Sequence, residues 1–459
     1  MEQPSFNGLL SLALILLLVS CDLWNSQDKN PDQEYTSLLC VRKDGKFGFI
    51  NEWGEEVIPC KYDQPSSFHE GWAALKKGDN WAYYDVRGHK VLDLGDRFTY
   101  CGQFHEGMAL VSTTPLKDML DIFQEFWDDL CPQLQFINKK GEVVLNVDNQ
   151  WDVLCSYVDK IGFSDGLLKV VTETSEGKLS GFLNNKGELV MPFNNRHQRI
   201  TQDLFSEGLV VAGKKIYDST FQKSTVVHGY KDTSDNWVIP PIYAKALPFK
   251  YGAAVVWEQN PKRELSYWTY LIDKKGNRIF PSDIHTNERY VRDSLLAVFK
   301  PRLNEDRVEV FSSYGKSRRY ALAKVDGTIL SDFIYESLMP GKSDECLWIA
   351  SLPDKKAYGA LDDSLNLIFP FQFPSIANSF EDGLAVVYLT EDGKAKGVIN
   401  SKGELVPLPD SSLNYQISGE IIYPNETGGF NYINRHGQPI NLEGYEKAGI
   451  FQRLPLPDR

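Results

Sequence analysis

A four-residue turn pattern recurs along this chain of 459 residues and limits what the chain can fold into. The pattern is Asn or Asp, then two further residues, then Gly. The short Asn and Asp side chains bond nearby backbone N–H groups, and Gly supplies the positive φ that a type I turn with a G1 bulge needs. Apolar runs flank most copies, so each copy predicts a β-hairpin. The copies are Asn51–Gly54, Asp85–Gly88, Asn138–Gly141, Asn184–Gly187, Asp273–Gly276, Asn400–Gly403 and Asn434–Gly437.

A second pattern lies between the hairpins: Phe, any residue, an acid or a substitute for it, and Gly. Small and aliphatic residues follow each copy, as in Ala73-Ala74-Leu75. This arrangement predicts another turn that leads into a buried strand. The copies are Phe68–Gly71, Phe104–Gly107, Phe163–Gly166, Phe205–Gly208, Phe249–Gly252 and Phe380–Gly383.

The two patterns together describe a repeat of three short strands, present in about ten copies over residues 37–443. Weaker hairpin copies stand at Asp235–Pro240, Asp326–Leu330 and Asp362–Leu365, and the last has lost the turn Gly. One hairpin cannot bury its apolar face alone, whereas stacked copies form a continuous core. We therefore predict an all-β fold of tandem antiparallel β-meander repeats. The array is either propeller-like or an open superhelix (solenoid).

One long gap between hairpins carries a different periodicity. Between residues 115 and 130, apolar residues such as Met119, Leu120, Phe123 and Trp127 recur at three- and four-residue steps, with acids between them. That spacing predicts a helix with one apolar face. We expect a helix inserted into a strand connection and packed on the β array, with an exposed partner-binding helix as the alternative.

The best-preserved unit, Asp44–Asp63, resembles the bacterial WG-repeat family. The family unit runs roughly G-K-W-G-[FY]-I-[DN]-x-x-G-x-x-V-I-P-x-x-Y-[DE] and continues F-x-[DE]-G-L-A-x-V. Asp44–Asp63 matches nearly every position, with Phe47 where the family has Trp, and later copies lose the aromatic-Gly pair, as at Gly397-Val398. The resemblance covers most of the chain after residue 36. It implies a role in interaction rather than a defined reaction.

The N-terminus is typical of a lipoprotein leader. Leu9 to Ser20 is an apolar run too short to span a bilayer, and it ends in a lipobox at Cys21, the expected site of lipid attachment. The segment before the run carries Glu2 and no Lys or Arg, which departs from the usual leader. Residues 1–21 are thus assigned to the signal peptide, 22–36 to a flexible tether and 444–459 to a C-terminal tail. We expect a lipoprotein anchored in the cell envelope, at the outer membrane or the periplasmic face.

The sequence offers no constellation that points to a reaction, a metal or a cofactor. His69 and His105 precede Glu70 and Glu106, but other copies of the repeat place Ser there, so a turn role explains both pairs. Seven cysteines show no CxxC and no zinc-ligand spacing, and they are compatible with either buried thiols or disulfides. The net charge of −13 opposes nucleic-acid binding.

We predict a non-catalytic binding or scaffold module for a protein or glycan partner at the cell envelope. The ligand-binding residues are not identifiable from the sequence, although the polar interval Lys300–Arg319 offers a local basic patch for an acidic glycan. The alternative is an envelope glycan-processing enzyme whose carboxylates come from distant loops. A purely structural envelope component is a third reading.

Overall fold

The structure is a computed structural model of the whole chain. It describes residues 35–113, 130–131, 134–147, 153–154, 162–174, 177–192, 198–200, 205–219, 222–260, 267–286, 291–292, 294–301, 318–341, 347–353, 355–376, 380–408, 415–418, 421–424 and 432–456. These residues form strands and turns and no helix, so the all-β prediction is confirmed. The predicted signal peptide, Cys21 and nearly all of the predicted helix over 115–130 lie outside the described residues. Leu130, at the end of that helix prediction, belongs instead to a short strand.

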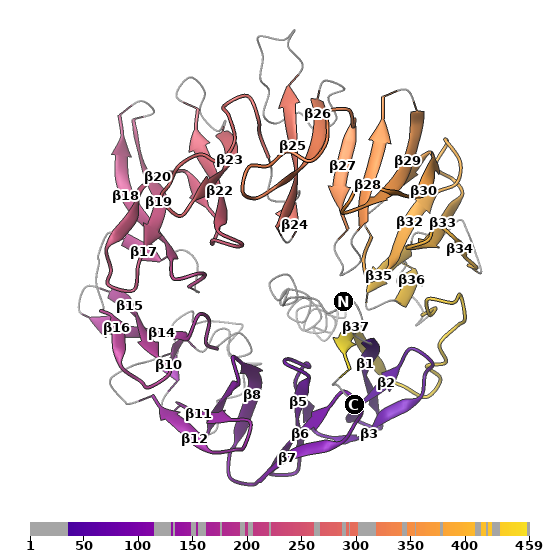
Figure 1. The fold of residues 1–459 in the computed structure, drawn as a ribbon. Coiled ribbons are helices and arrows are strands. Elements are labelled where there is room, and N and C mark those ends of the chain that lie inside the picture. The colour runs from indigo at the N-terminus through magenta and orange to yellow at the C-terminus, as the bar shows by residue number, and fades with distance from the viewer. Residues whose placement is uncertain are drawn as a thin grey trace, which may run out of the picture.

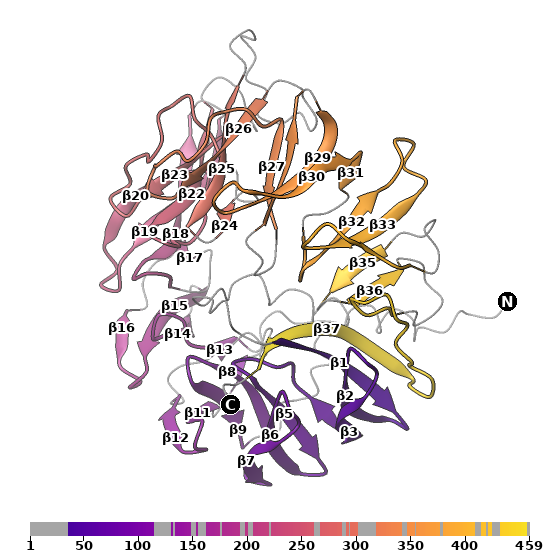
Figure 2. The same cartoon turned by 45° about the vertical axis from the view of Figure 1, so that its right-hand side comes forward.

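Small antiparallel sheets follow one another around a ring, which makes the fold a β-propeller (Figures 1 and 2). Five sheets after the first have four strands each. In chain order these are β4 (Gln64–Pro65), β5 (Trp72–Lys77), β6 (Asn80–Asp85) and β7 (Lys90–Gly95); β8 (Tyr100–His105), β9 (Met108–Ser112), β11 (Leu134–Asn138) and β12 (Val143–Asn146); β17 (Gln198–Ile200), β18 (Val210–Asp218), β19 (Lys223–Lys231) and β20 (Trp237–Tyr243); β27 (Ser337–Pro340), β28 (Leu347–Leu352), β29 (Lys355–Asp362) and β30 (Leu367–Phe373); β31 (Ser375–Ile376), β32 (Leu384–Tyr388), β33 (Lys396–Asn400) and β34 (Leu405–Val406).

The remaining sheets have three or two strands among the described residues. They are β14 (Leu167–Thr174), β15 (Gly177–Asn184) and β16 (Leu189–Met191); β21 (Lys245–Ala246), β22 (Ala253–Gln259) and β23 (Tyr267–Asp273); β24 (Val291–Arg292), β25 (Leu295–Pro301) and β26 (Arg318–Lys324); β35 (Tyr415–Ser418) and β36 (Ile421–Pro424); and β10 (Leu130–Cys131) with β13 (Val153–Leu154).

The first sheet joins the two ends of the chain and closes the ring. It contains β1 (Tyr35–Lys43), β2 (Lys46–Asn51), β3 (Glu56–Tyr62) and β37 (Lys447–Pro455), with β37 antiparallel to β1. The predicted tether over 22–36 and tail over 444–459 are therefore wrong in part, because Tyr35, Thr36 and most of the tail are strand. Pairing with the other end of the chain supplies the backbone partners that this Pro-containing tail cannot find locally. The closed ring also decides between propeller and solenoid.

All seven predicted Asn/Asp-x-x-Gly hairpins are present. In the first, the Gly54 N–H donates to the Asn51 carbonyl at 3.0 Å, and the Asn51 side chain accepts from the N–H groups of Trp53 and Glu55. Gly54 has φ of +81°. At Asp362–Leu365 the turn survives without Gly, because Leu365 itself adopts φ of +66° and donates to the Asp362 carbonyl at 3.0 Å. The Asp235–Pro240 copy begins earlier than predicted, with Asp232 opening the turn and Asp235 in the place of Gly.

A bulge in the last strand explains why Gly follows the aromatic residue of the repeat. The register of β19 against β20 shifts on both sides of Tyr230, which places the Ile239–Pro240 peptide against Gly229. A Cβ on Gly229 would lie 2.4 Å from the Ile239 carbonyl oxygen. Gly48 meets the corresponding peptide of β3, and Gly359 that of β30. The exposed Pro240 of the bulged strand also removes a donor from the outer sheet edge, where an unpaired strand invites aggregation.

Aromatic rings join successive sheets. The Phe of each Phe-x-acid-Gly turn is buried and packs on a ring or apolar residue of the preceding sheet. Phe104 lies 4.8 Å from the ring of Tyr83, and Phe249 lies 4.6 Å from that of Tyr230. Such edge-on and tilted aromatic pairs add to the stability gained from burial alone. The core is thus a series of clusters between neighbouring sheets. Within the described residues, no helix is long and apolar enough to cross a membrane.

Candidate binding face

The Phe-x-acid-Gly segments form two-residue hairpin turns, and the acid takes a left-handed backbone conformation. Glu70 has φ of +48° and Gly71 φ of +78°, while His69 and Trp72 exchange backbone hydrogen bonds at 2.9 and 3.0 Å. Positive φ at both central residues defines a type I′ turn, whose twist suits a β-hairpin. The predicted turn is confirmed in its position. Its acid, however, has a role that the sequence did not reveal.

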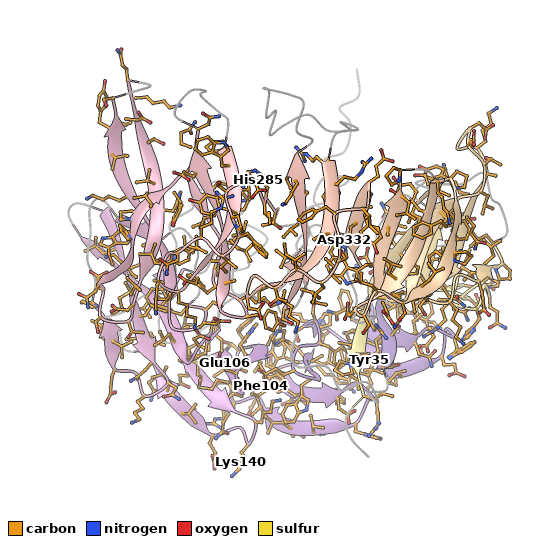
Figure 3. The ribbon with its side chains drawn as sticks, turned by 45° about the horizontal axis from the view of Figure 1, so that its top comes forward. Tyr35, Phe104, Glu106, Lys140, His285 and Asp332 are labelled. Atoms are coloured by element: carbon orange, nitrogen blue, oxygen red, sulfur yellow. The ribbon has the colours of Figure 1, made fainter. Side chains whose placement is uncertain are left out.

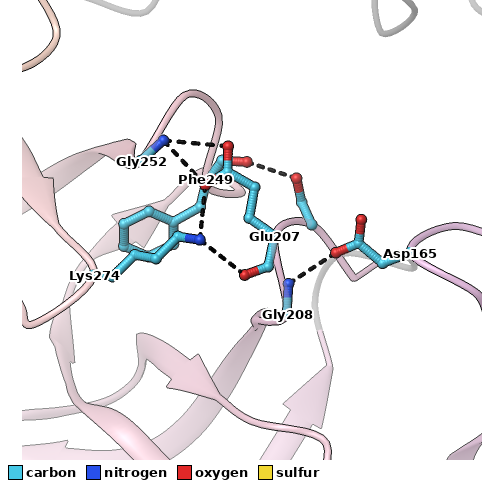
Figure 4. Close-up of polar contacts among 7 residues, drawn as sticks. Asp165, Glu207, Gly208, Phe249, Gly252 and Lys274 are labelled. Atoms are coloured by element: carbon cyan, nitrogen blue, oxygen red, sulfur yellow. Dashed lines mark hydrogen bonds and ion pairs between the residues drawn. The ribbon is translucent and has the colours of Figure 1, made fainter.

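Four of these acids each bind the next turn along the chain. The Glu70 carboxylate accepts from the Gly107 N–H at 3.1 Å. The same contact joins Glu106 to Gly166, Asp165 to Gly208 and Glu207 to Gly252, at 2.8, 2.9 and 3.0 Å respectively. Charge-assisted hydrogen bonds of this kind are stronger than neutral ones. We call this series of contacts the turn ladder, and Figure 4 shows the part of it that runs from Asp165 to Gly252.

At three of the turns, the residue before the acid makes a second contact between turns. Ser206 donates from its hydroxyl to the Phe249 carbonyl at 2.6 Å, and Ser164 does the same to Phe205 at 3.0 Å. His69 occupies the equivalent position, and its Nδ1 contacts the Phe104 carbonyl. Its ring also packs on that of His105, with centroids 4.1 Å apart. The two histidines predicted to serve turns are therefore placed between turns.

Lysines from the Asn/Asp-x-x-Gly hairpins complete the ladder. Lys274 Nζ lies 3.0 Å from the Glu207 carboxylate and donates to the Glu207 carbonyl at 3.1 Å (Figure 4). Lys139 binds Glu70 in the same way. These carboxylates accept hydrogen bonds from backbone and lysine, which gives them a structural role. Among the described residues, no group of three or more His, Cys, Asp or Glu side chains is placed to hold a metal ion.

Alternation of strand direction gives the ring two different sides. The type I′ turns and the Asn/Asp-x-x-Gly hairpins lie at the same end of each sheet, and the contact between Lys274 of a hairpin and Glu207 of a type I′ turn illustrates this. We call this end the turn side. The other end carries the connections between the second and third strands, and we call it the variable side. There the connections range from residues 44–45 and 78–79 to residues 113–133 and 302–317. Within a sheet, the turn-side connections range from residues 106–107 to residues 201–209, and the two longest connections lie on the opposite side.

Cations and aromatic rings pair close to the variable side of several sheets. Each pair is formed by residues of the second and third strands of a sheet, or of the first and second strands. The residues lie near the strand ends that lead into the variable-side connections. The pairs are Arg42 over Phe47 at 5.5 Å, Lys76 over Trp81 at 5.8 Å, Lys245 over Trp257 at 4.3 Å, Arg318 over Phe299 at 4.6 Å and Lys396 over Tyr388 at 5.8 Å. Most of these rings are half-buried, so part of each ring meets solvent. Cation–π pairs of this kind are worth roughly 0.5–1 kcal/mol at exposed sites.

Burial shifts several titratable groups in the interfaces between sheets. It raises the pKa of the Cys60 thiol to about 11, and it raises the pKa of the more deeply buried Cys101 well above the ordinary value. Both are free thiols, while Cys21, Cys131, Cys155 and Cys346 have no described side chain. Burial also lowers the pKa of His228 and of His285, and for His285 the nearby Arg278 and Arg318 lower it further.

Sequence reasoning identified the turns and the basic interval Lys300–Arg319, but it did not identify the variable side. Of that interval the structure describes Lys300, Pro301, Arg318 and Arg319. The signal for the variable side was present in the uneven spacing of the turn glycines. Assigning each long gap to one side of the ring required the strand order.

Family and structure comparisons support the repeat assignment. The WG containing repeat model matches residues 47–81, 229–256 and 358–391. These segments begin in the three sheets where a Gly packs against a bulged last strand. No curated protein matches the chain.

Solved structures resemble the chain only distantly. A crystal structure titled as the eukaryotic initiation factor is 9% identical, covers 92% of this chain and 98% of its own, and has a TM-score of 0.40. Porphyromonas gingivalis dipeptidyl peptidase 4 is 11% identical, with 83% and 64% covered and a TM-score of 0.37, so this chain spans less than two thirds of that protein. A Bacteroides caccae protein of unknown function is 12% identical, with 54% and 93% covered and a TM-score of 0.18. These TM-scores support no argument about function.

Proposed function

Because this chain carries WG-containing repeats on a closed β-propeller, we propose that it is a non-catalytic binding or scaffold module that engages a protein or glycan through the variable side. In repeat proteins, insertions that differ between repeats commonly gather on the face that binds. Loops on a rigid scaffold can change without disturbing the core. The location of the two longest connections within a sheet, residues 113–133 and 302–317, on one side of the ring is the observation that carries this proposal.

The turn side differs from the variable side in a way that supports the same assignment. Its carboxylates, lysines and Ser side chains bond from one turn to the next, as in the Glu207, Lys274 and Gly252 contacts. These contacts fix neighbouring sheets relative to one another and leave the variable side as a rigid platform. The cation–aromatic pairs on that platform suit a partner with negative charge and apolar surface.

The proposal places the protein at the cell envelope, held by lipid on Cys21. The apolar run Leu9–Ser20 and the lipobox before Cys21 support this location. Expression of the chain and of a Cys21→Ser variant in a bacterial host, followed by membrane fractionation and lipid labelling, tests it. We expect label and membrane association in the parent alone. An unlabelled parent protein would contradict the anchor.

A pull-down from envelope extracts, together with a glycan panel, tests the binding role. The bait is the chain from residue 22 onward, immobilised once through its N-terminus and once through a lysine-free tag at its C-terminus. Bound partners are then cross-linked and the contact peptides mapped. We expect cross-links at the variable side, near residues such as Lys76 and Lys396. Cross-links confined to the turn-side lysines Lys139 and Lys274, or no partner from either source, would contradict the proposal.

A further inference from the structure

Positive charge is concentrated at the variable side of one sheet, the one formed by β24, β25 and β26. Lys300 and Arg319 are directly opposite each other in the β25–β26 pair, and Arg318 is opposite Pro301. His285, labelled in Figure 3, pairs with Phe299 on the inner side of this sheet. Successive side chains of a strand point to opposite faces, so Lys300 and Arg319 share one face of this sheet and Arg318 lies on the other. Two cations therefore lie together on one face at the end of a small sheet, in a protein whose net charge is −13.

This arrangement places the positive charges of Lys300 and Arg319 side by side. Like charges directly opposite in an antiparallel pair are destabilising. Asp283 binds Lys300 at 3.2 Å, yet both side chains are largely open to solvent, at 61% and 42% exposure. A bound anion would relieve the repulsion between these cations.

Aromatic rings lie among the cations. The Lys300 ammonium sits 4.9 Å from the Phe333 ring centroid. In the preceding sheet, Lys245 lies over Trp257. Trp257 and Phe333 pack against the same apolar cluster between the two sheets, so the cations of both sheets border one continuous region. The region thus alternates positive charge with half-exposed rings across two sheets.

We propose that this region, defined by Lys245, Trp257, Lys300, Arg319 and Phe333 and called the cationic edge below, binds an anionic polysaccharide that carries carboxylates. The inference rests on the proposed binding function and names its ligand class. Lysine and arginine pair with carboxylates, and aromatic rings receive the apolar faces of sugar rings. Cations spread over two sheets suit a polymer with repeated charges better than a single small anion. The overall negative charge opposes a nucleic acid, whose affinity comes from many phosphate contacts.

Binding of polygalacturonate oligomers to the chain from residue 22 onward, measured by titration calorimetry at two salt concentrations, tests the inference. The test variant is Lys300→Gln/Arg319→Gln. The matched control is Lys214→Gln/Lys215→Gln, which removes two positive charges from exposed positions of β18, near the variable side of a different sheet. Circular dichroism and the thermal midpoint establish that both variants fold. Neutral dextran and poly-glutamate serve as comparison ligands.

We expect the parent and the Lys214/Lys215 control to bind polygalacturonate with equal affinity, more weakly at high salt. The Lys300/Arg319 variant should lose about tenfold or more, since each lost charge-assisted contact weakens binding severalfold. Equal affinity of all three proteins, or no binding by the parent, would overturn the cationic edge. Poly-glutamate binding as tight as polygalacturonate, with the same dependence on Lys300 and Arg319, would overturn the sugar assignment in favour of an acidic peptide. If this inference failed but the Lys300/Arg319 variant still captured a partner from envelope extract, the broader binding function would still hold.

Discussion

Replacing Gly229 with Ala tests the reasoning about the repeat most sharply. Gly229 precedes Tyr230 in β19 and lies against the bulge of β20. The added Cβ would sit 2.4 Å from the Ile239 carbonyl oxygen and 2.7 Å from the Pro240 carbonyl carbon, whereas ordinary contacts begin near 3.4 Å. Both obstacles are backbone atoms, so a side-chain rotation cannot relieve the overlap. The last strand of the sheet must retreat by about 1 Å.

The cost combines overpacking with lost pairing. Inserting a methyl group into a well-packed site costs about 1–3 kcal/mol. A strand shift that weakens one or two β19–β20 hydrogen bonds adds about 1 kcal/mol for each. We therefore expect Gly229→Ala to lower the free energy of unfolding by about 3 kcal/mol. Urea denaturation followed by tryptophan fluorescence measures the change as a lower midpoint, and Trp237 in β20 reports on the affected sheet.

Gly397→Ala is the matched control. Gly397 stands at the equivalent place in β33, but a Cβ there would meet the Leu405 side chain, at 2.9 Å from Cδ2. Leu405 is 56% exposed and can rotate away, so we expect a change below about 1 kcal/mol. Equal stability of Gly229→Ala and the parent protein, or equal losses in both variants, would refute the explanation of the repeat glycine.

Three further predictions concern buried and bridging groups. Asp235→Asn should destabilise the fold by about 3 kcal/mol, because Lys231 is only 3% exposed and would lose its charged partner; an unchanged melting temperature would contradict this. Glu207→Gln should cost about 1 kcal/mol by weakening its bonds to Gly252 and Lys274, and hydrogen exchange at the Gly252 N–H should speed up relative to the parent. The folded protein lowers the pKa of His228 below its ordinary 6.5, so the unfolded chain binds the proton more readily and stability should fall as pH drops below about 6.5. Denaturation midpoints of the parent and of His228→Gln, compared at pH 8 and pH 5, should show a smaller pH dependence in the variant, and an equal dependence in both would contradict the assignment.

Local features of the fold could be predicted because their causes are local. Asn51 and Gly54 carry the whole chemistry of their turn within four residues, and the same holds for the other six hairpins. The Phe-x-acid-Gly turns were predictable for the same reason. The turn at Asp362–Leu365 survives loss of its Gly because the flanking strands of the sheet hold Leu365 in a left-handed conformation that it would rarely adopt alone.

Long-range features could not be predicted from single segments. β1 and β37 pair across almost the whole chain, and the Leu454-Pro455 segment has no local signal for a strand. The contact from Glu106 to Gly166 spans sixty residues of sequence. The repeated acid and Gly were visible in the sequence, but only the stacking of sheets shows that one binds the other.

The candidate binding face was the least predictable part. The basic character of Lys300 and Arg319 was evident, yet their placement directly opposite each other depends on the β25–β26 register. Trp257 and Phe299 come from separate sheets, and no spacing rule relates them. Connection lengths identify a side of the ring only once the order of strands is known.

Closure of the ring by the two ends of the chain is the central structural claim, and a disulfide tests it most directly. Thr36 and Leu454 are directly opposite in the β1–β37 pair, where the separation of facing residues suits a disulfide. A Thr36→Cys/Leu454→Cys variant, in a background with all seven native cysteines changed to Ser or Ala, should form an intrachain cross-link under mild oxidation. The cross-link should appear as faster migration on a non-reducing gel and raise the thermal midpoint. Failure of the two cysteines to join in the folded monomer would contradict a closed propeller.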